Sequence, residues 1–291
     1  MIKYNIVFAS DENYLQHLSV GLASLLYNNS SLEFNIYIIN GGIGVASWKK
    51  LKDICKDYNA NIIDLCIDDG IFSNLILNHH FTKANYYRLL IPNLIEVDKV
   101  LYLDSDLVVH GSIKELYNTN LGDFYLGAVE NPGFDRHSQL KMDNTSKYFN
   151  SGVMLINNFK WRESNLFSKV INFIKENKES IEFVDQCGLN GFINGNWKEL
   201  PLKYNQQTII FDKLFPEIFN CFSMSEIIEA KNRPIIIHFT GSSKPWHLRN
   251  KHPYKNKYWK YLNKSPFKNV FMIFFERFIR LINKTIILKQ R

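Results

Sequence analysis

The amino-acid sequence predicts an α/β protein whose open sheet is covered by helices, and two observations support this. Over the first 67 residues, apolar strand-like segments alternate with segments whose apolar residues recur at helical spacing. Polar and acidic residues then follow directly after several of the strands, as they do at a ligand-binding sheet edge. The order strand, helix, strand, helix, strand places the strands side by side and parallel, with right-handed connections.

Each element of this arrangement follows from a local pattern. The first three strands are expected at 2–9, 33–39 and 60–67. Leucines from Leu15 to Leu26 share one helical face, and the segment from Trp48 to Tyr58 predicts a second helix. The elements expected next are a short helix from Thr82 to Leu90 ended by Pro92, strands at 99–103, 124–129, 152–157 and 234–239, and a helix over 165–177. No repeat or low-complexity linker precedes residue 247, so residues 1–246 are expected to form one domain.

Composition excludes several classes of protein. The chain has 291 residues, of which 46% are apolar and 22% are charged, and these values argue against global disorder. Its four cysteines are scattered without a CxxC pair, which predicts reduced thiols and a cytosolic compartment. The first residues carry no signal-peptide pattern, and no apolar run reaches the roughly 18 to 20 residues that a spanning helix needs.

The net charge of +7 is distributed unevenly along the chain. Residues 247–291 hold twelve Lys or Arg and one acid, so this tail carries +11 and the preceding body carries −4. Within the tail, helical spacing relates seven apolar residues, namely Phe267, Val270, Phe271, Phe274, Phe278, Leu281 and Ile282. A basic amphipathic helix of this kind is typical of an anionic membrane surface, the alternative being a helix packed on the body. The large apolar face of this predicted helix argues against nucleic acid as the partner.

The sharpest local motif is Asp104-Ser105-Asp106, which comes directly after the apolar strand that ends at Leu103. Two carboxylates at the end of a strand can converge on one divalent cation, and oxygen ligands suit Mg²⁺ or Mn²⁺. The alternative is a solvated turn, since Asp and Ser both favour turns.

A second motif, from His238 to Trp246, follows the strand Pro234 to Ile237. An imidazole at a strand end can complete a metal site and shifts the preference towards Mn²⁺. Gly241 allows the backbone to approach a ligand, and Lys244 supplies a positive charge for a diphosphate. Taken alone, such a histidine is more often a core or capping residue.

Together the two motifs resemble glycosyltransferase family 8, in particular bacterial lipopolysaccharide α-galactosyl- and glucosyltransferases. Leu-Tyr-Leu-Asp-Ser-Asp and the later His-Phe-x-Gly-x-x-Lys-Pro-Trp carry the resemblance. Further matching segments lie at 8–14, 87–89, 148–153 and 185–186, in the same order as in the family. The resemblance covers about residues 2–246 and implies that residues 1–246 are a catalytic domain.

The resemblance implies a Rossmann-like A-type nucleotide-diphospho-sugar transferase fold with a mixed central sheet, a UDP-sugar donor and Mn²⁺ or Mg²⁺. The implied metal ligands are Asp104, Asp106 and His238. The implied donor-binding residues are Ala9, Asp11 and Asn13 at uracil and ribose, Arg88 at the donor sugar or diphosphate, Gly241 and Lys244 at the diphosphate, Asn150 beside the sugar, and Ser105 between the two carboxylates. Asp185 and Gln186 would also line the sugar and are the candidate catalytic residues. From the residue types alone, a helix N-cap is the preferred role for Asp11.

The family retains the configuration at the anomeric carbon. Gln186 stands where a nucleophile would be needed and is a poor one, so front-face attack is expected, with Asp185 as the alternative nucleophile. A lipid-linked saccharide acceptor at the inner face of the cytoplasmic membrane would explain the basic tail. Two other functions remain open at this level: a self-glucosylating initiator resembling glycogenin, and a non-catalytic nucleotide-sugar-binding module.

Overall fold

The computed structural model describes residues 2–77, 81–212 and 214–268, in which strands and helices alternate as the sequence predicts. The strands are β1 (Lys3–Ser10), β2 (Glu33–Asn40), β3 (Ala60–Cys66), β4 (Lys99–Leu103), β5 (Leu107–Val109), β6 (Leu126–Glu130), β7 (Phe149–Asn157), β8 (Lys198–Glu199), β9 (Gln206–Gln207) and β10 (Ile236–His238). The α-helices are α1 (Leu15–Asn28), α2 (Val45–Cys55), α3 (Ile91–Leu94), α4 (Lys114–Tyr117), α5 (Asn158–Glu163), α6 (Leu166–Glu176), α7 (Val184–Ile193), α8 (Ile218–Cys221), α9 (Met224–Asn232) and α10 (Lys255–Leu262). The 3₁₀ helices are η1 (Glu12–Tyr14), η2 (Asp69–Phe72), η3 (Lys83–Leu90), η4 (Lys178–Ser180), η5 (Leu202–Tyr204) and η6 (Thr208–Phe211).

Seven strands form a mixed central sheet in the order β3-β2-β1-β4-β7-β6-β8. The first four in this order are parallel, and β7 then runs antiparallel to both β4 and β6. The direction of the sheet therefore changes between β4 and β7, beside the carboxyl end of β4. This arrangement confirms the α/β class and the mixed sheet that the sequence predicts.

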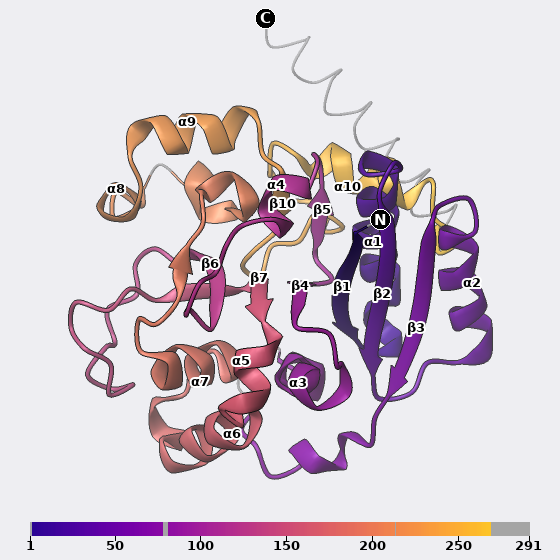
Figure 1. The fold of residues 1–291 in the computed structure, drawn as a ribbon. Coiled ribbons are helices and arrows are strands. Elements are labelled where there is room, and N and C mark those ends of the chain that lie inside the picture. The colour runs from indigo at the N-terminus through magenta and orange to yellow at the C-terminus, as the bar shows by residue number, and fades with distance from the viewer. Residues whose placement is uncertain (1, 78–80, 213, 269–291) are drawn as a thin grey trace, which may run out of the picture.

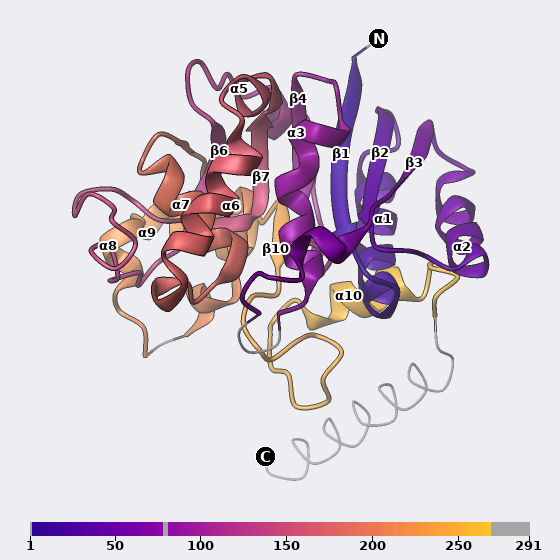
Figure 2. The same ribbon diagram turned by 90° about the horizontal axis from the view of Figure 1, so that it is seen from below.

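Helices cover both faces of the central sheet, as Figures 1 and 2 show. On one face α1 and α2 pack against side chains such as Ile6, Phe8 and Ile36, which are fully buried. On the other face η3, α3 and the helices α5 to α7 pack against residues such as Val7 and Tyr102. Because β1 is buried on both sides, its sequence is almost continuously apolar rather than alternating.

A second, three-stranded sheet in the order β5-β10-β9 lies next to the central one. Three residues separate β4 from β5, and β5 pairs antiparallel with β10 so that Leu107 faces His238. Helix α10 packs against α1 and this sheet through a buried cluster that includes Tyr258, Trp259 and Leu262. This small sheet thus brings the two distant motifs of the sequence together.

The structure refines the bounds of three predicted elements. The helix after Thr82 ends at Leu90 as predicted, but Pro92 does not break the chain's helical course, because it lies in the first turn of α3, where no backbone N–H is needed. Strand β7 begins at Phe149, earlier than predicted, so that Asn150 belongs to a strand. His238 is the last residue of β10, inside the strand predicted at 234–239.

The first part of the predicted basic tail, residues 247–268, is folded and packs against the body of the protein. Helix α10 lies within it, and Ser265 is buried, with its hydroxyl 2.8 Å from that of Ser19. The division after Trp246 stays a prediction, and the amphipathic helix predicted beyond Lys268 lies outside the described residues. None of the four cysteines forms a disulfide. In the described ranges, every helix is too short or too polar to cross a bilayer.

Candidate active site

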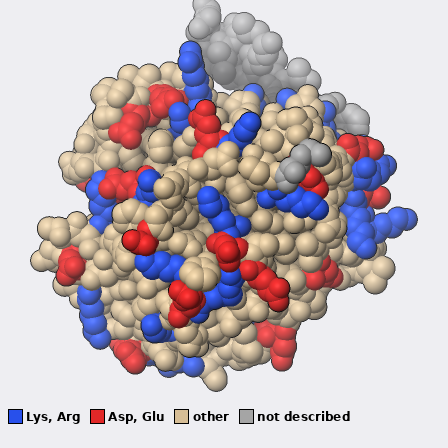
Figure 3. Space-filling view, viewed as in Figure 1, with Lys and Arg blue, Asp and Glu red and all other residues tan. Residues whose placement is uncertain are grey.

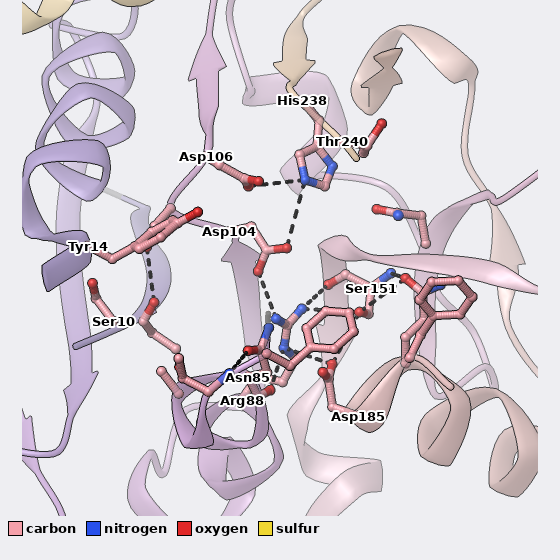
Figure 4. Close-up of a pocket in the computed structure, with 18 of the residues that line it drawn as sticks. Ser10, Tyr14, Asn85, Arg88, Asp104, Asp106, Ser151, Asp185, His238 and Thr240 are labelled. Atoms are coloured by element: carbon pink, nitrogen blue, oxygen red, sulfur yellow. Dashed lines mark hydrogen bonds and ion pairs between the residues drawn. The ribbon is translucent and has the colours of Figure 1, made fainter. Parts of the chain in front are cut away.

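A pocket of about 300 Å³ opens at the carboxyl ends of β1 and β4, where the sheet changes direction. All the predicted site residues except Asn13 line it, namely Ala9, Asp11, Arg88, Asp104, Ser105, Asp106, Asn150, Asp185, Gln186, His238, Gly241 and Lys244. Asn13 lies on η1 with an exposed side chain and is not among the lining residues. Figure 4 shows Asp104 and Asp106 turned towards His238 above Arg88.

Asp104, Asp106 and His238 bring two carboxylates and an imidazole to within 4.8 Å of one another. His238 Nε2 lies 3.2 Å from Asp106 Oδ1 and 3.8 Å from Asp104 Oδ2. The cluster fits only because Gly152 has no side chain: a Cβ there would lie 2.2 Å from His238 Cε1 and 2.7 Å from Asp104 Oδ2.

The second oxygen of each carboxylate is held by a cationic side chain. Arg88 Nη2 lies 2.9 Å from Asp104 Oδ1, which also accepts a hydrogen bond from the Tyr102 hydroxyl. Lys244 Nζ pairs with Asp106 Oδ2. Burial opposes charge on Asp106, but Lys244 and His238 outweigh it and hold the pKa of this carboxyl well below its ordinary value.

Each carboxylate therefore has one oxygen on Arg88 or Lys244 and the other oxygen facing the imidazole of His238. Oxygen and imidazole donors converging in this way are a ligand set for a hard or borderline divalent cation such as Mg²⁺ or Mn²⁺. The residues present thus fit a divalent metal, with Asp104 Oδ2, Asp106 Oδ1 and His238 Nε2 as the donor atoms.

Arg88 is buried and connects Asp104 of the candidate metal site to Asp185 at the start of α7. Besides Asp104, its guanidinium contacts Asp185 Oδ2 at 3.0 Å and donates to the Ser151 carbonyl at 2.8 Å. Burial works against its charge, but the carboxylates of Asp104 and Asp185 hold its pKa above the ordinary value. Burial also raises the pKa of Asp185 to about 6, although Arg88 opposes this. Arg88 is therefore held by protein carboxylates in this structure rather than by solvent.

Asp185 and Gln186 begin α7 and point back to β7. The Gln186 Oε1 atom accepts a hydrogen bond from the Ser151 backbone N–H at 3.0 Å, and the Ser151 hydroxyl donates to Asp185 at 3.2 Å. Ser151 thus fixes both candidate catalytic side chains. The sequence motif around Asn150 contains Ser151, but nothing in its pattern indicates this role.

Tyr14 is an aromatic residue of the pocket wall that is backed by further rings. It packs edge-on against Trp246, whose ring stacks on His17 with centroids 3.4 Å apart. Asp11 Oδ1 accepts a hydrogen bond from the Tyr14 backbone N–H, so Asp11 does cap the short helix η1 while it lines the pocket. Helical spacing could have related Tyr14 to His17, whereas no local signal relates either of them to Trp246.

A family model described as Glycosyl transferase family 8 matches residues 5–250. The chain belongs to glycosyltransferase family 8. General stress protein A of Bacillus subtilis (strain 168) is 35% identical over 261 residues, which cover 87% of this chain and 91% of that protein. The lipopolysaccharide 1,3-galactosyltransferase of Salmonella typhimurium (strain LT2) is 28% identical over 261 residues, covering 86% and 75%. 

Solved structures agree with this family membership. A crystal structure of the galactosyltransferase LgtC in complex with donor and acceptor sugar analogues has a TM-score of 0.78 and 26% identity, covering 90% of this chain and 96% of that one. This family 8 chain is therefore a glycosyltransferase of the A-type fold that uses a nucleotide-sugar donor. The resemblance drawn from the sequence motifs is confirmed.

Proposed function

We propose that this glycosyltransferase moves galactose or glucose from a UDP-sugar to a saccharide acceptor of a cell-surface glycan, with retention of the anomeric configuration. The observation that carries the proposal is the convergence of Asp104, Asp106 and His238 at the pocket, with Lys244 beside them. The relatives support it, since one is named a lipopolysaccharide 1,3-galactosyltransferase and another a galactosyltransferase.

The proposed cofactor is Mn²⁺, with Mg²⁺ as the alternative. Asp104, Asp106 and His238 would hold it, and the imidazole favours Mn²⁺ over Mg²⁺. A bound divalent ion would act as a Lewis acid on the departing diphosphate. Lys244 would then contribute a second positive charge on the same side of the pocket, and Gly241, whose φ is +82°, would present its backbone to the phosphates.

Transfer requires an acceptor hydroxyl to form a bond to the anomeric carbon while the bond from that carbon to the diphosphate oxygen breaks. The electron pair of the broken bond goes to the diphosphate. In front-face attack the acceptor proton goes to a departing phosphate oxygen, so no protein nucleophile is required. The chain's role is then to orient the donor and to stabilise the negative charge that develops.

The contacts of Asp185 and Gln186 favour this route over a covalent intermediate. Gln186 is an amide whose oxygen already accepts from the backbone N–H of Ser151. Asp185 is 2% exposed, and its Oδ2 atom is occupied by Arg88 and Ser151. We assign both side chains to hydrogen bonds with the sugar hydroxyls, together with Asn150 on β7.

We further propose that the acceptor is lipid-linked and that the chain works at the inner face of the cytoplasmic membrane. Residues 247–268 contain seven Lys or Arg and no acid. Helix α2 adds three lysines, which gather at the right-hand edge of the molecule in Figure 3. A positive surface of this kind is attracted to anionic lipid, by about 1 kcal/mol for each basic residue close to the leaflet.

The activity is tested by incubating the purified chain with Mn²⁺ and a panel of UDP-, GDP- and ADP-hexoses, and by measuring nucleotide release. Release from UDP-galactose or UDP-glucose well above that from the other donors is expected. The configuration of the product, determined by NMR, should match that of the donor. Inversion of configuration, or equal release from every donor, would contradict the proposal.

A further inference from the structure

Asn205 is a buried asparagine in contact with the candidate metal site, although it is not a candidate ligand. It lies between η5 and β9 and has no exposed surface. Its Oδ1 atom is 2.9 Å from His238 Nδ1, and its Nδ2 atom donates to Asn150 Oδ1 at 2.9 Å. Asn205 therefore connects the imidazole to a residue that lines the donor pocket.

The direction of these hydrogen bonds is set by a backbone group. The N–H of Gly152 can only donate, and it lies 3.1 Å from the side-chain oxygen of Asn150. That oxygen must therefore be the acceptor, so the group of Asn205 facing it must be the NH₂ group. The Asn205 oxygen then faces His238 Nδ1, and Nδ1 must carry a proton to donate to it.

With a proton on Nδ1, neutral His238 carries its lone pair on Nε2, on the side of Asp104 and Asp106, where a cation bound by the two carboxylates would accept it. A metal-ligating histidine generally donates its other ring N–H to an oxygen, which fixes both the tautomer and the orientation of the ring. Here the oxygen comes from Asn205, and its own direction is fixed through Asn150 by Gly152.

We propose that Asn205 is a positioning residue, which holds His238 in the tautomer and orientation that bind the divalent metal and couples the metal site to Asn150. The inference rests on the proposed metal site. Loss of the Asn205 amide should weaken Mn²⁺ binding by 10- to 100-fold, as removal of such a supporting oxygen does in metal sites generally.

The test compares Asn205→Leu with Asn205→Asp by electron paramagnetic resonance of free Mn²⁺ in the absence of nucleotide. Asn205→Leu should bind Mn²⁺ at least tenfold more weakly than the wild type. Asn205→Asp keeps an acceptor for His238 and should stay within threefold of the wild type or bind more tightly. It loses the donor to Asn150, so its KM for the donor sugar should rise.

Two controls separate positioning from general damage to the fold. Asn158 is equally buried but lies away from the pocket, where its side chain donates to the carbonyls of Ile95 and Val97. Asn158→Leu should lower the thermal unfolding midpoint without changing Mn²⁺ affinity. In a His238→Ala background, Asn205→Leu should change Mn²⁺ affinity by less than twofold, because no imidazole remains to be oriented.

The possible outcomes distinguish this inference from the proposed function. A wild-type chain that binds no Mn²⁺ would overturn both the metal site and the role of Asn205. A folded Asn205→Leu variant with unchanged Mn²⁺ affinity would overturn the role of Asn205 alone. If Asn205→Leu does not fold, a tenfold loss of Mn²⁺ affinity in folded Asn205→Asp would overturn it instead.

Discussion

Lys244 and Asp106 form a partly buried ion pair although 138 positions separate them in the sequence. The Lys244 ammonium also donates to the carbonyl of Phe239 at 2.7 Å. The ammonium pairs with Oδ2 of Asp106, while Oδ1 of Asp106 faces His238. The ammonium and a metal cation would thus share one carboxylate, and their charges would repel each other in the absence of an anionic ligand.

This arrangement predicts opposite effects for one substitution. Lys244→Met should raise the affinity for Mn²⁺ alone by roughly tenfold, because it removes a neighbouring positive charge. It should lower the affinity for UDP in the presence of Mn²⁺ by a similar factor and reduce turnover, because the diphosphate loses a counter-charge. Calorimetric titrations with Mn²⁺ and with UDP measure both effects. The control is Lys203→Met, which breaks a solvent-exposed ion pair with Glu229 that does not line the pocket and should leave both constants unchanged.

Asp104→Asn and Asp106→Asn should each reduce turnover by at least a hundredfold, because each removes a charged ligand of the proposed metal. Neither should unfold the chain, since the amide keeps the size and one oxygen of the side chain. Initial rates at saturating UDP-hexose and Mn²⁺ measure the effect. Asp98→Asn, which removes an exposed partner of Arg162, serves as the control. Turnover within threefold of the wild type in either site variant would refute the metal assignment.

Gly152→Ala should damage the metal site more than the fold. A Cβ at this position would lie 2.2 Å from His238 Cε1 and 2.7 Å from Asp104 Oδ2, so at least one of these side chains must move. Mn²⁺ affinity should fall by at least tenfold. Gly122→Ala offers the comparison. Gly122 lies in a turn and no atom lies within 4 Å of its Cβ position, although its φ of +50° costs stability. Equal Mn²⁺ affinity in the two variants would show that close packing at Gly152 is unimportant.

His17 should make the stability of the chain depend on pH. Burial lowers the pKa of His17 from its ordinary 6.5 to about 4. Between these values the unfolded chain binds the proton and the folded chain does not, so the free energy of unfolding falls as pH falls from 6.5 to 4. Relative to His17→Gln, the wild type should lose roughly 2 kcal/mol between about pH 7 and pH 4.5. Urea unfolding of both proteins across this range measures it, and parallel pH curves would exclude His17 as the source.

Residues 269–291 should bind anionic vesicles without being needed for chemistry. The chain should be shortened after Lys268 and no earlier, because Ser265 and Phe267 pack against the body. The shortened chain should float less with anionic vesicles and still release UDP from its donor. Added salt should weaken flotation of the full chain, since salt screens its charges. Equal flotation of the two chains would assign membrane binding to the body, where α2 and α10 carry lysines.

The sequence by itself determined the order of strands and helices from β1 to β4, because buried strands and one-faced helices leave local apolar patterns, whereas short strands such as β5, β8 and β9 leave too few residues for one. It also predicted that Asp104 and Asp106 follow a strand, since adjacent residues at a strand end share one neighbourhood. It predicted the helix from Thr82 to Leu90 but not the short helix α3 that follows directly, because a proline can either end a helix or lie in the first turn of the next one.

Only the tertiary structure decided which distant groups meet. His238 reaches the two carboxylates because β10 pairs with β5, and Lys244 reaches Asp106 because the loop after β10 folds back over it. Asn205 could not be recognised from the sequence, because the chain around it has no local pattern that points to His238. Its contact depends on which strands pair, and strand pairing is set by packing of the whole sheet rather than by neighbouring residues.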